Sequence, residues 1–137
     1  MTFEELDETL PNGFHDAKIV RVAIDYAERS AILIMQLLVG MPDSADPEEY
    51  RKATVKITGL CYYSIEPPDP NYPFLRGGTP IGVAGYPEDS AAFAALNALL
   101  SVMPKGVDCY RFFVHDWNSF IHVAAEEVHF EWVDGAA

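Results

Sequence analysis

The sequence predicts an α+β fold: a mostly antiparallel sheet of about five strands, with one main helix packed on one face and a short helix at the N-terminus. Three observations lead to this fold class. Several segments alternate apolar and polar residues, which is typical of strands. One segment places apolar residues at helical spacing, and short polar links between strand-like segments predict hairpins.

The size and composition of the chain predict a folded protein. It has 137 residues, half of them apolar and 22% charged, which is enough for a sizeable hydrophobic core. We therefore expect residues 1–137 to form a single domain.

The first 17 residues predict a short helix and a turn. Thr2 is a good N-terminal cap, and two acidic residues follow it in the first turn of the helix. In the following "GFHDA" segment, we expect Gly13 to turn the chain, Phe14 to enter the core and Asp16 to cap the turn.

Three strands are expected next. Residues 18–26 alternate, and residues 31–39 are apolar on both faces, so the two segments predict a hairpin that includes a central strand. Alternation resumes over residues 53–65 and predicts a long strand, bent where Gly59 interrupts it.

The second half of the chain begins with an irregular stretch. Residues 66–87 are rich in proline and glycine and predict a long loop. Residues 90–103 place Phe93, Leu96, Leu100 and Met103 on one stripe and predict the main helix. Two strands over 109–115 and 120–133 should form a second hairpin, with a bulge at Glu126–Glu127 where the apolar phase slips.

The charge balance limits the kinds of partner. The chain has 21 acidic and 9 basic side chains, a net charge of −12, which repels nucleic acid and anionic membranes and favours a basic protein. Two cysteines cannot form a zinc site that needs three or four. No apolar run reaches the roughly 18 residues of a membrane helix. No leader precedes the first strand, so we expect a cytoplasmic protein with free thiols and no cofactor.

Aromatic and acidic residues gather around the proline-rich segment. Aromatic anchors among acidic groups suit a basic protein surface, although the same residues could simply cover one end of the core. The candidate partner-binding residues are Tyr62, Glu66, Asp69, Tyr72, Phe74, Tyr86, Glu88, Asp89 and Trp117, with Trp117 expected to be exposed in a turn.

A metal or polar site is the alternative. Histidine and carboxylate side chains recur in two His-Asp dipeptides and on the last strand, where they could hold a divalent ion or serve a small hydrolase. The candidate residues are His15, Asp16, His122, Glu127 and His129. The chain has no serine-nucleophile motif, phosphate loop or helical metal-ligand pair, so an enzyme is less expected than a binding protein.

The segment "FHDA", followed by "KIVRVAIDY", an acidic turn and a second apolar strand, resembles small bacterial proteins of the FHDA/FHDS kind. The segment "ATVKITGL" adds a general similarity. Some of these proteins are assigned as immunity proteins of polymorphic toxin systems. The resemblance implies a non-enzymatic protein that neutralises a toxin encoded beside it, and it carries no catalytic residues.

Overall fold

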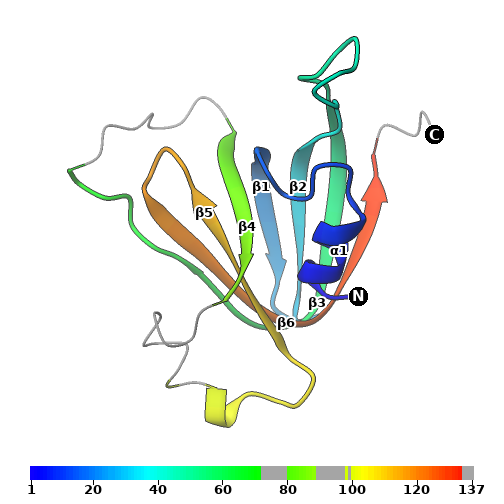
Figure 1. Cartoon of the computed structure of the whole chain (residues 1–137). Helices are drawn as coiled ribbons and strands as arrows, with labels where there is room; N and C mark the ends of the chain where they lie inside the picture. The colour runs from blue at the N-terminus through cyan, green and yellow to red at the C-terminus, as the bar shows by residue number, and fades with distance from the viewer. Residues whose placement is uncertain (72–79, 89–97, 99, 134–137) are drawn as a thin grey trace.

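The strands of the chain form a closed antiparallel barrel in the order β1-β2-β3-β6-β5-β4 (Figure 1). The computed structural model describes residues 1–71, 80–88, 98 and 100–133. Within these ranges the elements are α1 (Phe3–Thr9), β1 (Ala17–Asp25), β2 (Ser30–Leu38), β3 (Tyr50–Ile65), β4 (Ile81–Pro87), the 3₁₀ turn η1 (Leu100–Val102), β5 (Asp108–Val114) and β6 (Ser119–Trp132).

The predicted α+β class, with a main helix packed on an open sheet, is wrong. Strand β4 lies in the segment that was predicted to be a loop. Residues Ala17–Ile19 of β1 pair with Ile81–Val83 of β4, and this pairing closes the sheet on itself. Most of the predicted helix over 90–103 lies outside the described residues, and its end forms the 3₁₀ turn η1.

The local predictions at the N-terminus are largely confirmed. Helix α1 begins after Thr2 with a full capping box, in which Thr2 and Glu5 exchange side-chain to backbone hydrogen bonds. Gly13 has a φ of +56°, and Phe14 is completely buried. The cap of this turn differs, because the Phe14 N–H donates to Asp7 Oδ1 at 2.7 Å rather than to Asp16.

Both predicted hairpins are present, but the irregular position in the long strand pair was misplaced. β1 pairs with β2 and β5 pairs with β6, each antiparallel. Gly59 has a φ of +61°, as the predicted bend requires. The register shift between β3 and β6 lies on β3, between Leu60 and Tyr62, so the bulge predicted at Glu126–Glu127 is wrong.

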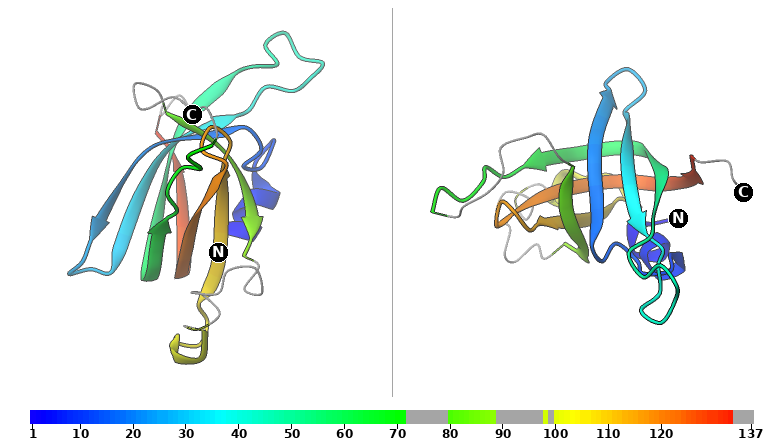
Figure 2. Two further views of the ribbon diagram at one scale, coloured as in Figure 1. Left: turned by 90° about the vertical axis from the view of Figure 1, so that its left-hand side faces the viewer. Right: turned by 90° about the horizontal axis from the view of Figure 1, so that it is seen from above.

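The core fills the interior of the barrel and extends under α1. Figure 2 shows the strands of the barrel and α1 from two further sides. Phe3 and Leu6 of α1 are buried, and the Phe3 ring stacks on Tyr110 with the ring centres 5.1 Å apart. Phe14 meets Phe112 edge to face at 5.4 Å. The N-terminal helix therefore completes the core with aromatic rings rather than covering an open sheet face.

Gly85 of β4 leaves room for this aromatic cluster. A Cβ atom at this position would collide with the ring and hydroxyl of Tyr110, which is 3% exposed and stacked on Phe3. A Cβ atom on Gly82 of the same strand would make only an ordinary contact with His115. The glycine content of 80–87, which made the segment look like a loop, serves close packing inside a strand.

We expect Gly85→Ala to lower the free energy of unfolding by about 2 kcal/mol, because the ring of Tyr110 has no space to move away. Gly82→Ala is the matched control in the same strand and should change stability by no more than about 0.5 kcal/mol. Denaturant unfolding of both variants tests this, and equal effects would contradict the close approach at Gly85.

Burial in the barrel raises the pKa of Tyr63 from its ordinary 10.0 to about 12. The folded state therefore holds this proton more tightly than the unfolded chain, and the stability it contributes is complete below pH 10 and lost as the pH rises through about 12. In Tyr63→Phe, we expect the free energy of unfolding to fall less between pH 10 and 12 than in the unmodified protein. Unfolding curves over this range that coincide in their pH dependence would show that Tyr63 is not protected.

Candidate functional site

A row of side chains crosses the outer surface of the barrel. Pairing places Tyr86 of β4 beside Arg111 of β5, Arg111 beside His122 of β6, and His122 beside Ser64 of β3. The residues next to them in the chain, such as Tyr110 and Val123, belong to the core. Since side chains alternate along a strand, these four side chains, which we call the His122 row, point away from the core.

His122 is held between two carboxylates. Its Nδ1 lies 2.5 Å from Glu88 Oε2, and its Nε2 lies 2.7 Å from Glu66 Oε2. The side chains of His122 and Glu88 are 3% and 2% exposed, whereas that of Glu66 is 35% exposed. We call these three residues the His122 clamp; one of its ends reaches the surface.

Backbone pairing places both carboxylates. Glu66 directly follows β3, and its N–H donates to the carbonyl of Phe120 at 3.0 Å. Its Oε1 in turn accepts a hydrogen bond from the Phe120 N–H at 3.0 Å. Glu88 follows β4, and its N–H donates to the carbonyl of Cys109 at 3.3 Å. The clamp therefore joins the ends of β3 and β4 to β6.

The clamp is a proton-sharing group rather than a metal site. Each of its two hydrogen bonds needs one hydrogen between an imidazole nitrogen and a carboxylate oxygen. The carboxylates lie at opposite edges of the imidazole ring, which prevents all three groups from meeting at one ion. Among the described residues, no three His, Cys, Asp or Glu side chains have a geometry that could hold a metal ion.

The two neighbours of His122 in the row contain buried polar atoms. Arg111 lies with its Cζ 4.6 Å from the centre of the Phe120 ring and adds a positive charge beside the clamp. Among the described residues, neither Arg111 Nε nor Ser64 Oγ has a hydrogen-bond partner, although both atoms are buried. Orphaned donors of this kind are costly and concentrate at sites with a role beyond packing.

The structure brings several predicted partner-binding residues together. Glu66 and Glu88 form the clamp, and Tyr86 stands in the His122 row with 47% of its surface exposed. Tyr62 lies two residues before Ser64 on β3, so it points to the same side. Tyr72, Phe74 and Asp89 lie outside the described residues.

Asp69 and Trp117 lie at the end of the same strand pair. The Asp69 N–H donates to the carbonyl of Trp117 at 2.9 Å. Hydrogen bonds from the Asn71 N–H and from the Asn118 side chain lower the pKa of the Asp69 carboxyl. Trp117 lies in a turn, as predicted, but it packs partly buried against the core, so the prediction that it is exposed is wrong.

The five residues predicted as a metal or polar site fall into three separate places. His15 Nε2 lies 3.3 Å from Asp16 Oδ2 in an exposed turn, and His129 lies 3.4 Å from Glu127 on an exposed part of β6. His122 contacts neither pair and lies seven residues before His129, about 23 Å along the strand. As a single site, this set is wrong.

Sequence reasoning placed His122 in the wrong group and missed Arg111. One signal was present: His122 stands in "FIHVAA", where the residues on both faces of the strand are apolar. A histidine in such a run is expected to be buried on either face, and it then needs partners for both ring nitrogens. The partners are 34 and 56 residues away in the chain, so no local pattern indicates them.

The two cysteines form no disulfide with one another. Cys61 and Cys109 are both free and partly buried. Burial raises the pKa of the Cys109 thiol, with further contributions from the negative charges of Glu88 and Asp108 and from Cys61. A raised pKa keeps Cys109 in its thiol form, which is a poor nucleophile.

No family model, no curated protein and no solved structure matches this chain. No helix in the described part of the chain combines the length and apolar character needed to cross a membrane.

We expect His122→Ala to lower the free energy of unfolding by about 3 kcal/mol, because the buried carboxylate of Glu88 loses its bond to the imidazole. The matched control is His129→Ala on the same strand, whose side chain is 56% exposed and which should change stability by less than about 0.5 kcal/mol. Denaturant unfolding at neutral pH measures both changes. A His122 variant as stable as the His129 variant would show that the clamp does not hold the ends of β3 and β4.

Proposed function

We propose that this chain is a cytoplasmic binding module that recognises a basic protein through the outer surface around the His122 clamp. In the setting implied by the FHDA resemblance, it acts as an immunity protein that neutralises a basic toxin by covering its surface. The observation that carries the proposal is the clamp, because it fixes the partly exposed carboxylate of Glu66 on the outer side of the barrel through the buried pair of His122 and Glu88.

Preorganisation supports this role. A surface whose charged groups are already fixed loses little conformational entropy when it binds. Glu66 is held by His122 and by the Phe120 N–H and keeps 35% of its side chain exposed. Asp69 is fixed in the same way by Asn71 and Asn118. Both carboxylates therefore present a defined geometry to a lysine or arginine of the partner.

The net charge and an exposed aromatic ring also support the binding of a basic protein. A net charge of −12 attracts a basic protein over long range and raises the rate of association. Tyr86, exposed at 47%, offers an aromatic ring beside the acidic groups, and such rings dominate the energy of many interfaces. Tyr62 adds a second ring on the same side.

The closed barrel determines how a partner could dock. β1 pairs with β4 only over Ala17–Ile19, but β5 and β6, which carry the centre of the His122 row, are paired along both sides. A partner therefore has little free strand edge at this surface on which to add a strand, and recognition there has to use side chains. This favours an interface of charged pairs and aromatic anchors, as proposed here.

The protein encoded by the neighbouring gene is the test partner, measured by isothermal titration calorimetry at low and high salt. We expect a complex that weakens as salt rises, and at least a tenfold loss of affinity in Tyr86→Ala and in Asp69→Asn. Tyr26→Ala and Asp43→Asn remove the same chemical groups from exposed positions outside this surface and should leave affinity unchanged.

Two results would overturn the proposal. One is no binding of a basic neighbouring gene product at low ionic strength. The other is binding that depends on Tyr26 and Asp43 as much as on Tyr86 and Asp69, since that would place the interface elsewhere.

A further inference from the structure

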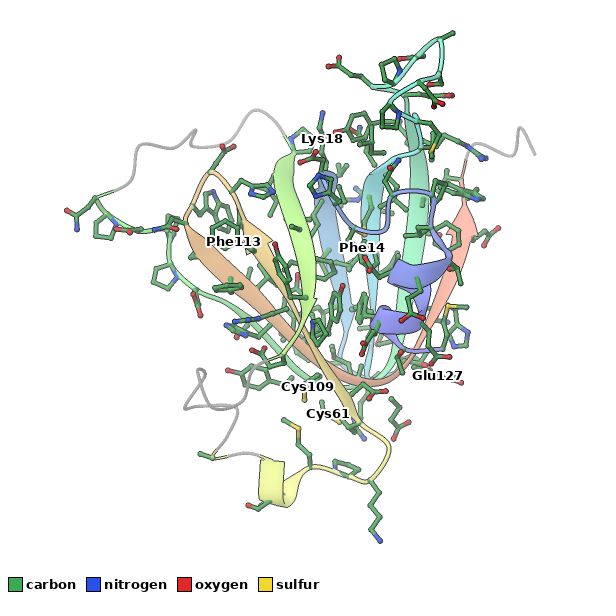
Figure 3. All side chains as sticks on the ribbon, viewed as in Figure 1. Phe14, Lys18, Cys61, Cys109, Phe113 and Glu127 are labelled. Atoms are coloured by element: carbon green, nitrogen blue, oxygen red, sulfur yellow. The ribbon has the colours of Figure 1, made fainter. Side chains whose placement is uncertain are left out.

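A separate cavity opens at the end of the barrel, between the β1–β2 turn and the bend of β3. Its volume is about 240 Å³. Figure 3 labels Cys61, one of its lining residues, at this end of the molecule. The cavity is lined by Ile24, Asp25, Tyr26, Arg29, Leu60, Cys61, Tyr62 and Tyr63.

Two backbone irregularities lie next to each other beside this cavity. Arg29, in the β1–β2 turn, has a φ of +49°, which is unfavourable for a side chain of this kind. On the neighbouring strand β3, Gly59 has a φ of +61° and the register shifts between Leu60 and Tyr62. The Leu60 N–H donates to the Arg29 carbonyl at 2.8 Å and joins the two features. Strained backbone and bulges gather where a protein has to aim side chains at a ligand.

Two opposite charges stand at the rim. Arg29 Nη2 donates to Cys61 Sγ at 3.3 Å and to the Leu60 carbonyl at 3.4 Å, which holds the guanidinium against β3. Asp25 Oδ1 accepts a hydrogen bond from the Glu28 N–H at 3.0 Å, which fixes the carboxylate four residues away from Arg29. No ion pair joins Asp25 and Arg29 in the described structure, so each keeps atoms for another partner.

The rest of the cavity is apolar and aromatic. Leu60 and Tyr63 pack against the core and form its inner side. Ile24 and the rings of Tyr26 and Tyr62 complete the lining, and the Tyr26 ring is 87% exposed. At about 240 Å³ the space lies below the roughly 300–1,000 Å³ of sites for drug-sized ligands. It suits a ligand with a single aromatic ring.

We propose that this cavity binds a free aromatic α-amino acid. The ring lies against Leu60 and Tyr63, the carboxylate meets the Arg29 guanidinium, and the ammonium meets Asp25. Both charges are needed, because a carboxylate alone would be repelled by Asp25 and an amine alone by Arg29. This site needs no protein partner and does not rest on the function proposed above, although Tyr62 belongs to both surfaces.

The test uses the full chain, labelled with ¹⁵N, and follows backbone amide shifts during titration. The probes are L-phenylalanine, 3-phenylpropanoate, which lacks the ammonium, and phenethylamine, which lacks the carboxylate. We expect saturable shifts confined to the turn after β1 and to 60–63, with L-phenylalanine binding at least tenfold more tightly than either analogue.

Variants assign each charge. Arg29→Gln should weaken the binding of L-phenylalanine at least fivefold and leave the binding of phenethylamine no weaker. Asp25→Asn should also weaken the binding of L-phenylalanine and leave the binding of 3-phenylpropanoate no weaker. Arg21→Gln removes an exposed arginine from β1 outside the cavity and should change nothing. If Arg29→Gln disturbs the turn, Arg29→Lys keeps the charge and should retain part of the affinity.

Absence of a saturable shift with L-phenylalanine would overturn the proposal. Equal affinities for the three probes would also overturn it, since the cavity would then select only for the ring. The same holds for an Arg29→Gln variant that binds L-phenylalanine as tightly as the unmodified protein.

Discussion

Pairing between β1 and β4 holds the barrel closed, and it involves three residue pairs, from Ala17–Val83 to Ile19–Ile81. Every other strand contact in the barrel joins longer stretches. Without this short seam, β4 and β5 would be free to swing away from β1. The interior would then open at Phe14 and Phe112, which pack beside it. The pairings β3–β6, β6–β5 and β5–β4 place the ends of β3 and β4 next to the outer face of β6, where the clamp forms.

How far the sequence could predict this structure depended on distance along the chain. The capping box at Thr2, the turn at Gly13 and both hairpins were predictable because each depends on residues close together in the sequence. The seam joins residues more than 60 positions apart, and one side of it lies in a glycine-rich segment typical of loops. Gly85 shows why this segment was predicted as a loop and not as a strand. Its missing side chain makes room for Tyr110, which lies next to it only in the folded barrel.

Predictions for the candidate site also depended on distance along the chain. Glu66, Glu88 and Tyr86 were identified as chemically interesting because acids and aromatic residues cluster around the proline-rich segment. Their convergence on His122 was not predictable, because the histidine is 56 and 34 residues away from the two glutamates. The sequence instead grouped His122 with His129 because both lie on the last strand. A position on one strand says little about proximity when seven residues of extended chain separate two side chains.

The energetics of the clamp bear on why the chain contains it. Moving charged groups out of water is costly, and an apolar set of similar volume is often as stable as a buried ion pair or more so. Stability alone therefore does not account for His122, Glu66 and Glu88 on an outer face, nor for the unbonded Arg111 Nε beside them. What the clamp does provide is position: it fixes the ends of two strands and directs the half-exposed carboxylate of Glu66 outward. A surface that has to recognise a charged partner with a defined geometry would gain from that arrangement, which is why the clamp is the basis of the binding function proposed above.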